Sequence, residues 1–270
     1  WVKRPGPSTM NYDFAALIDT GRTRDNNEDS VRYDAATGLC VLADGMGGYN
    51  AGEVASGMAT AYIADHLSDW LSGVNAQTGV KEVVAAMHAC VQSANGSIFH
   101  AATTHEPYEG MGTTLVVAVF LRNHLVLGHI GDSRCYRYRN RTLTQLTRDH
   151  SLLQEQLDAG LISPLEAAVS PHKNLVTRAM GVEPHVELEV HEYVVEPGDL
   201  YLLCSDGLTD MVDDAALATL LSGGDDLDAV AQRLVDSANA CGGRDNIAVL
   251  LANARPRTKR NGLVSRLLGK

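Results

Sequence analysis

Aspartates recur in this chain directly after short apolar runs, with small or turn-forming residues behind them. Asp44 follows residues 40–43 and precedes Gly45-Met46-Gly47-Gly48. The other acidic sites of this kind are Glu28-Asp29, Asp132, Asp206 with Asp210, and Asp245. One such aspartate is most simply a turn or cap residue. Five sites gathered at the mouths of buried strands would repel one another and would be costly to desolvate.

Divalent cations remove this cost, so the acidic sites together indicate a cation centre. Carboxylate oxygens are hard ligands of the kind that Mg²⁺ and Mn²⁺ accept. Gly45 after Asp44 fits this interpretation, because a glycine lets a backbone carbonyl approach an ion closely.

No other catalytic pattern in the sequence has comparable support. The ten histidines lack the H-E-x-x-H spacing of a zinc protease. The chain has no G-x-S-x-G nucleophile elbow, no P-loop and no G-x-G-x-x-G after a strand. Residues 45–48 are rich in glycine but lack the lysine of a P-loop.

Composition and charge limit the class of protein and the kind of partner. With 270 residues, 45% hydrophobic and 20% charged, the chain permits one large domain or two small ones around a real core. It carries 22 basic and 33 acidic residues, a net charge of −11. A surface of that sign repels a phosphate backbone, so we expect no nucleic-acid partner.

The cysteines and the lengths of the apolar runs predict a cytoplasmic protein. Five cysteines are widely scattered without a C-x-x-C pair, which favours reduced, buried thiols over a disulfide framework or a zinc site. No apolar run approaches the ~20 residues that span a bilayer, so we expect no transmembrane segment.

Apolar periodicity predicts an α+β fold. Strands are expected over residues 11–20, 39–43, 113–121, 124–130, 200–204 and 247–252, with tight turns at Arg122-Asn123 and Asn140-Arg141. Amphipathic helices are expected over 54–71, 80–98 and 226–238. Because strands come in hairpin-like groups and helices in pairs, we predict a sandwich of two antiparallel β-sheets flanked by α-helices.

Three segments differ from the pattern of the predicted sandwich, whose domain is expected to cover residues 10–254 and to include a flap. Residues 1–9 share no pattern with the rest of the chain, and we interpret them as a tag or linker remnant. Residues 150–178 are polar and interrupted by glycine and proline, as expected for an inserted flap. Residues 255–270 form a basic tail without acidic residues, either solvated or a short amphipathic segment that touches a partner or a membrane surface.

Six short motifs in this order resemble the protein phosphatase 2C-like (PPM) metal-dependent serine/threonine phosphatases, in particular the bacterial branch. They are Arg24-Asp25-Asn26-Asn27-Glu28-Asp29, Asp44-Gly45-Met46-Gly47-Gly48, Ala51-Gly52-Glu53, Gly131-Asp132-Ser133-Arg134, Ser205-Asp206-Gly207-Leu208-Thr209-Asp210 and Gly243-Arg244-Asp245-Asn246. Each string is weak evidence alone. All six in order are a strong signal, and the resemblance covers roughly residues 11–253 and implies the two-sheet fold predicted above.

The resemblance implies a role for each acidic residue. Asp44 would bridge two tightly bound Mn²⁺ or Mg²⁺ ions, with Asp206 and Asp245 on the first ion and the Gly45 carbonyl on the second. Glu28 and Asp29 would act through bound waters. Asp132 and Asp210 match positions that hold a third, looser ion in bacterial relatives.

The resemblance also implies hydrolysis of phosphoserine and phosphothreonine on proteins, which reverses the action of a serine/threonine kinase. Two cations ~3.5–4 Å apart share a water of lowered pKa, and the bridging hydroxide attacks phosphorus in line. Arg24 would grip the substrate phosphate as a bidentate fork; the alternative is a surface salt bridge to Asp25 or Glu28.

One position departs from the animal members of this family, which carry a histidine proton donor where Met46 stands. Methionine cannot donate a proton. The leaving oxygen would instead take its proton from bound water or from the region around Asp132.

Two other functions are compatible with parts of the pattern. A non-catalytic phosphoprotein-binding module should lack a metal ligand, and none is missing here. A phosphodiesterase or nuclease disagrees with the acidic net charge. We therefore expect phosphorylated proteins as partners and a monomeric enzyme.

Overall fold

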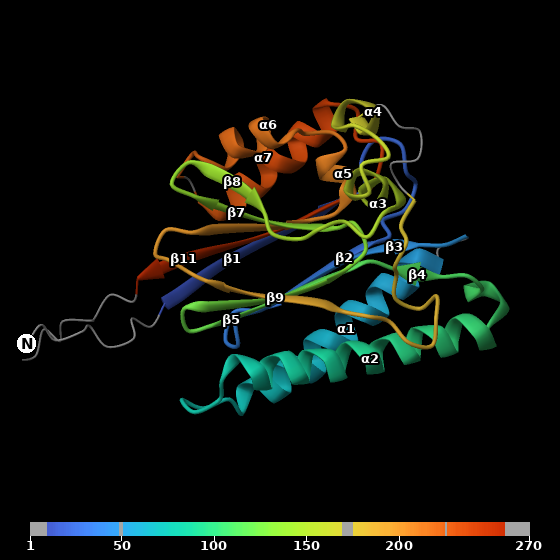
Figure 1. Cartoon of the computed structure of the whole chain (residues 1–270), viewed down its shortest axis with the longest axis horizontal. Helices are drawn as coiled ribbons and strands as arrows, with labels where there is room; N and C mark the ends of the chain where they lie inside the picture. Colours follow the sequence, from blue (N-terminus) through green and yellow to red (C-terminus); the bar gives the residue numbers. More distant parts are fainter. Residues whose placement is uncertain (1–9, 49–50, 169–174, 225, 257–270) are drawn as a thin grey trace, which may run out of the picture.

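The computed structural model describes residues 10–48, 51–168, 175–224 and 226–256, which form two antiparallel sheets packed face to face (Figure 1). The first sheet has the order β1 (Met10–Asp19), β11 (Ile247–Pro256), β10 (Leu200–Cys204), β7 (Arg134–Arg139), β8 (Thr142–Gln145). The second has the order β2 (Asp29–Asp34), β3 (Leu39–Met46), β5 (Leu115–Leu121), β6 (His124–Ile130), β9 (Glu189–Val194), with β4 (Gly112–Thr113) beside β3.

The strands follow the apolar runs of the sequence. β6 and β10 coincide with their predicted ranges, and β3 and β11 extend beyond theirs. The predicted strand over 113–121 is divided into β4 and β5 at Thr114. Arg122, Asn140 and Arg141 adopt positive φ angles of 58°, 51° and 63° in the two predicted hairpin turns, as tight two-residue turns require.

Helices cover the outer face of each sheet, which confirms the predicted α+β sandwich (Figure 1). α1 (Ala51–Ser72) and α2 (Val80–Thr104) pack on the second sheet through Ile63, Leu67 and Met87. α6 (Asp214–Leu221) and α7 (Leu227–Ala240) pack on the first sheet through Leu217 and Leu234.

A third apolar layer lies between the two sheets. Leu42 and Leu127 from the second sheet pack with Tyr201 and Leu250 from the first, and all four are fully buried. Cys40, Cys135 and Cys204 are buried free thiols, as the sequence predicts, whereas Cys90 is only partly buried and Cys241 is exposed, contrary to the prediction. The layer fixes the two sheets against each other, so residues at the ends of their strands have defined positions.

The predicted flap contains two short helices, α3 (Leu152–Asp158) and α4 (Pro164–Ala168). The His150 N–H donates to the Gly131 carbonyl of the sandwich at 2.9 Å, and the Thr177 N–H donates to the His150 carbonyl at 2.8 Å, which joins the two ends of the flap. Leu161 and Leu165 are largely exposed on it. Residues 169–174 lie outside the described residues.

The predicted terminal segments also fall largely outside the described residues, namely 1–9 and 257–270. The assigned domain boundaries therefore stay predictions. Among the described helices, none combines the length and the apolar character needed to cross a bilayer.

Candidate metal centre

Asp29 and Asp44 face each other across the antiparallel pair of β2 and β3. They are register partners at the start of one strand and near the end of the other. Two like charges directly opposite each other in a sheet are destabilising. The apolar residues that precede Asp44, from Leu39 to Ala43, are fully buried and hold this strand end in place.

The backbone around Asp44 is held by two threonines at the junction of β4 and β5. The Asp44 N–H donates to Thr114 Oγ1 at 3.0 Å, and the Asp44 carbonyl accepts from Thr113 Oγ1 at 2.8 Å and from the Thr114 N–H at 2.8 Å. Because the N–H and the carbonyl of Asp44 are both hydrogen-bonded, its Cα, from which the side chain extends, is held in place.

Asp206 enters the same region from the first sheet. It is the first residue of α5 (Asp206–Thr209), which is separated from the end of β10 by Ser205 alone. The preceding residue, Ser205, is buried, and its hydroxyl donates to Asp29 Oδ2 at 2.7 Å. Ser205 therefore joins the end of one sheet to a carboxylate of the other.

Asp245 precedes β11, and its neighbour Asn246 anchors the loop that carries Glu28. Asn246 Oδ1 accepts from the Glu28 N–H at 2.8 Å. Asn246 Nδ2 donates to the carbonyls of Thr20 at 3.0 Å and Asn26 at 2.8 Å. The amide side chain thus fixes the N-terminal acidic motif against the C-terminal one, more than 200 residues away.

Two glycines allow the backbones in this region to approach closely. A Cβ on Gly45 would lie 2.1 Å from the Gly52 carbonyl oxygen and 2.7 Å from that of Glu28. A Cβ on Gly207 would lie 1.9 Å from the Asn246 carbonyl oxygen. Any larger residue would push apart the segments that carry the acidic side chains.

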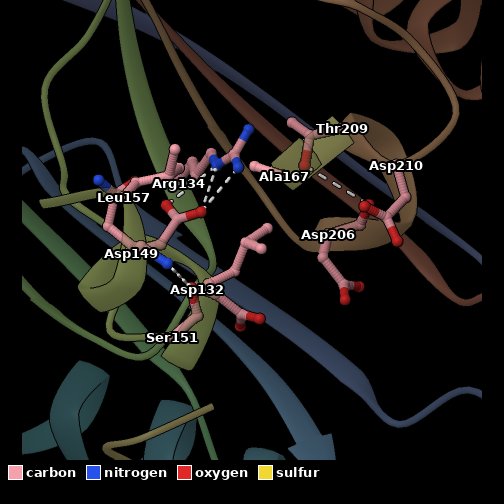
Figure 2. Close-up of a pocket in the computed structure, with 11 residues that line it drawn as sticks. Asp132, Arg134, Asp149, Ser151, Leu157, Ala167, Asp206, Thr209 and Asp210 are labelled. Atoms are coloured by element: carbon pink, nitrogen blue, oxygen red, sulfur yellow. Dashed lines mark hydrogen bonds and ion pairs between the residues drawn. The ribbon is translucent and has the colours of Figure 1, made fainter. Parts of the chain in front are cut away.

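Asp132 and Asp210 lie on the flap side of this region, around a cavity of about 250 Å³ that also contacts Asp206 (Figure 2). Figure 2 shows Asp132 and Asp206 on facing walls, with Asp210 on the α5 side. On the flap side, Asp149 receives a bidentate contact from Arg134 at 2.6 to 3.0 Å, so its charge is already compensated.

Arg24 is half exposed at the edge of the acidic region and pairs with Asp245. Its Nη2 lies 2.8 Å from Asp245 Oδ2. The ion pair considered for Arg24 from the sequence involved Asp25 or Glu28, whereas the partner in the structure is Asp245, 221 positions away in the chain.

The ionised state of these carboxylates is unfavourable, because they are buried and lie close to one another. Burial, followed by the charges of Asp29, Asp206, Asp132 and Asp245, raises the pKa of Asp44 well above its usual range. Burial and the charge of Asp132 do the same to the pKa of Asp206. Burial raises the pKa of Asp29 to about 7 against the opposing hydrogen bond from Ser205.

These observations fit a divalent cation centre. Asp29 Oδ1 is buried and has no hydrogen-bond partner within the described part of the chain, so it is available to a ligand. The donors are oxygens throughout, which suits Mg²⁺ or Mn²⁺. Among the described residues, three ligand atoms within 4.8 Å of one another occur at His129, His150 and Glu189, not at the aspartates.

Three residues that support the site could not be assigned a role from the sequence: Ser205 and Asn246, which lie within the motifs, and Thr114. Their function depends on contacts with Asp29, Glu28 and Asp44 that span 70 to 218 positions. For Ser205 and Asn246, the one signal in the sequence is their position next to an acidic residue in a glycine-containing motif.

Comparison with known proteins adds an independent finding. A family model described as protein phosphatase 2C matches residues 20–252. The serine/threonine phosphatase Stp of Listeria welshimeri is 39% identical over 90% of this chain and 95% of the relative.

Two further similarities involve proteins named PstP. The serine/threonine protein phosphatase PstP of Mycobacterium tuberculosis is 41% identical over 91% of this chain, which spans 45% of that longer protein. A crystal structure of the PstP catalytic domain in complex with two manganese ions superposes with a TM-score of 0.81 at 40% identity, covering 92% of this chain and all of that domain.

Proposed function

The chain belongs to the protein phosphatase 2C family and is a metal-dependent protein serine/threonine phosphatase, and we propose that its acidic region is the catalytic centre. Asp44, Asp206 and Asp245 would hold two Mn²⁺ or Mg²⁺ ions together with the Gly45 carbonyl, and Glu28 and Asp29 would contact them through water. The observation that carries this proposal is the set of like-charged carboxylates from both sheets, with the buried, unpartnered Asp29 Oδ1 among them.

The protein residues prepare this centre before any substrate arrives. When bound, the divalent cations lower the pKa of water towards neutrality and offset charge on a phosphoryl group. Thr114 fixes the backbone of Asp44, Ser205 fixes the carboxylate of Asp29, and Asn246 fixes the backbone of Glu28. Such preorganised groups lower the reorganisation needed during the reaction.

We propose that Arg24 binds the substrate phosphate. Its guanidinium is half exposed and already lies at Asp245, so a phosphate above the aspartates would be within reach of its remaining donors. A planar guanidinium can hold two phosphate oxygens at once and can stabilise charge on them.

We propose that the leaving oxygen takes its proton from the region around Asp132, where Asp210 would share a third, looser cation. Met46 cannot supply this proton, and a Cβ on Gly112 would lie 3.0 Å from the Met46 methyl carbon, which supports a packing role for this residue. Asp132 is buried on the wall opposite Asp206 (Figure 2).

The substrates we propose are proteins phosphorylated by a serine/threonine kinase, handled by a monomeric enzyme in the cytoplasm. The reduced, buried thiols of Cys40, Cys135 and Cys204 support a reducing compartment. The flap borders the cavity next to Asp132 through Leu153, Leu157 and Ala167, a position that suits contact with residues flanking the phosphorylated side chain.

Hydrolysis assays test this function against the alternatives. The purified chain should release phosphate from an aryl phosphate and a phosphothreonine peptide only with Mn²⁺ or Mg²⁺, and Asp206→Asn should abolish turnover. Asp213→Asn, at the N-cap of α6, is the matched control and should remain active. Phosphopeptide binding without turnover would favour a non-catalytic module, and faster cleavage of a phosphodiester would favour a nuclease.

A further inference from the structure

A second cluster of possible metal ligands lies outside the acidic region, where the flap meets the end of β6. His129 on β6 and Glu189 on β9 are register partners, and His150 joins them from the flap side. One ligand atom from each residue lies within 4.8 Å of the other two. None of the three has a role in the proposed phosphatase centre.

His129 has a free lone pair in a buried position. The side chain is fully buried, and its Nε2 lies 2.8 Å from the Arg148 carbonyl oxygen. Because a carbonyl only accepts, Nε2 carries the proton and Nδ1 carries the lone pair. Nδ1 has no hydrogen-bond partner among the described residues. A buried polar atom without a partner is unfavourable, so a ligand that supplies one is favoured.

His150 and Glu189 have the complementary arrangement. The Gly131 N–H donates to His150 Nδ1 at 3.1 Å, so the proton of the neutral ring is on Nε2 and points to Glu189 Oε2 at 3.2 Å. Burial lowers the pKa of both histidines. Partial burial opposes it, but hydrogen bonds from His191 and His150 hold the pKa of Glu189 at about 2. Near pH 7 the group is therefore two neutral imidazoles and one carboxylate.

We propose that His129 Nδ1, His150 Nε2 and a Glu189 oxygen bind one divalent transition-metal ion of the Zn²⁺ type. Two imidazole nitrogens and a carboxylate suit Zn²⁺, Co²⁺ or Ni²⁺ better than the oxygen-seeking Mg²⁺ or Mn²⁺. Binding moves the His150 proton from Nε2 to Nδ1, so the hydrogen bond that Nδ1 accepts from the Gly131 N–H is lost. The two rings, now stacked with centroids 4.6 Å apart and planes 14° from parallel, must rotate so that their lone pairs converge.

The Arg178 guanidinium lies beside the same atom. Its Nη1 lies 3.3 Å from His150 Nε2 and donates to the Glu187 carbonyl at 3.3 Å. A positive guanidinium at this position repels a metal ion and must move away when one binds. The occupancy of the site is thus linked to the end of the flap that Arg178 holds.

Zn²⁺ titration by isothermal calorimetry tests the site, with variants that separate it from the acidic region. Asp206→Asn weakens the acidic region and should still bind one equivalent of Zn²⁺. His129→Gln and Glu189→Gln, each added to Asp206→Asn, should lose that equivalent or bind it at least about tenfold more weakly. His88→Gln, an exposed histidine on α2, is the matched control and should change nothing.

A further variant and a spectroscopic measurement with Co²⁺ test the same site independently. Arg178→Ala in the Asp206→Asn protein should bind Zn²⁺ more tightly than its parent. Co²⁺ alone should give the visible absorption of a four-coordinate nitrogen and oxygen site, and Glu189→Gln should remove it while the far-ultraviolet circular dichroism stays native. Equal Zn²⁺ binding with and without His129, or no Zn²⁺ equivalent in Asp206→Asn, would overturn the proposal.

Discussion

Arg24 Nη2 lies 2.8 Å from Asp245 Oδ2, so the residue proposed to bind phosphate already contacts a residue proposed to bind metal. This contact joins the N-terminal and C-terminal motifs at the edge of the acidic region. The negative charge of the aspartates holds the arginine at this edge. A substrate phosphate could approach it there once cations neutralise the aspartates.

We expect Arg24→Ala to lower kcat/KM for a phosphothreonine peptide roughly 10- to 100-fold. The reason is the loss of charged hydrogen bonds worth about 1.5–3 kcal/mol. Arg255→Ala is the matched control, because Arg255 also forms an exposed ion pair, with Asp13 at 2.7 Å, but lies away from the site. Steady-state kinetics at saturating Mn²⁺ measure both. Unchanged kcat/KM in Arg24→Ala would remove Arg24 from the substrate site.

Asn246→Ala should destabilise the fold by about 2–4 kcal/mol, because three hydrogen bonds to a buried amide are lost at once. The midpoint of thermal unfolding should fall by roughly 5–15 °C. Asn11→Ala, at an exposed position on β1, should cost under about 0.5 kcal/mol. Equal melting temperatures for the two variants would contradict the anchoring role.

The metal-free protein should lose stability as pH rises from about 4 to 7. Asp29 has a pKa of about 7 in the fold against about 3.9 when unfolded, so the folded state binds more protons in this window and stability falls with pH. Burial and the charge of Asp149 raise the pKa of Asp132 to about 6, which acts in the same direction.

Thermal melts of chelator-treated protein at pH 5 and pH 7.5 check this prediction. Adding Mn²⁺ should abolish the loss at pH 7.5, because cations neutralise the carboxylates. Asp29→Asn should raise the melting temperature of the metal-free protein at pH 7.5 and weaken Mn²⁺ binding. A metal-free protein that is more stable at pH 7.5 than at pH 5 would argue against repulsion among these groups.

Gly207→Ala should destabilise the protein by at least about 1–3 kcal/mol, since its Cβ would lie 1.9 Å from the Asn246 carbonyl oxygen. Gly57→Ala in α1 is the control, because no atom lies within 4 Å of a Cβ at this helical position. That variant should gain about 0.5–1 kcal/mol. Denaturant unfolding compares the two, and a stable, active Gly207→Ala protein would show that the close approach is not required.

The apolar pattern predicted the fully buried strands and missed two that are mostly half-buried or exposed. β2 and β9 were not predicted, and they are the two edges of the second sheet. Their residues are mostly half-buried or exposed, so a continuous apolar run is not needed to form them. Backbone pairing with β3 and β6 holds these two strands in the sheet, and their own sequences carry no strong strand pattern.

The acidic residues of the site were predicted individually, and the fold brings their strand ends to one region. Their exact ligand roles stay predictions. What could not be predicted was the support: the contacts of Ser205 with Asp29 and of Asn246 with Glu28 join distant segments whose approach depends on the packing of both sheets. The partner of Arg24 was missed for the same reason, because Asp245 becomes its neighbour only in the folded chain.

The central claim is that aspartates from both sheets hold two divalent cations, and anomalous diffraction from a crystal grown with Mn²⁺ tests it most directly. Data collected at the manganese edge should show two strong peaks beside the Asp44 carboxylate, with Asp206 and Asp245 as ligands. Absence of manganese signal from this region, in an enzyme that still requires Mn²⁺ for turnover, would contradict the claim.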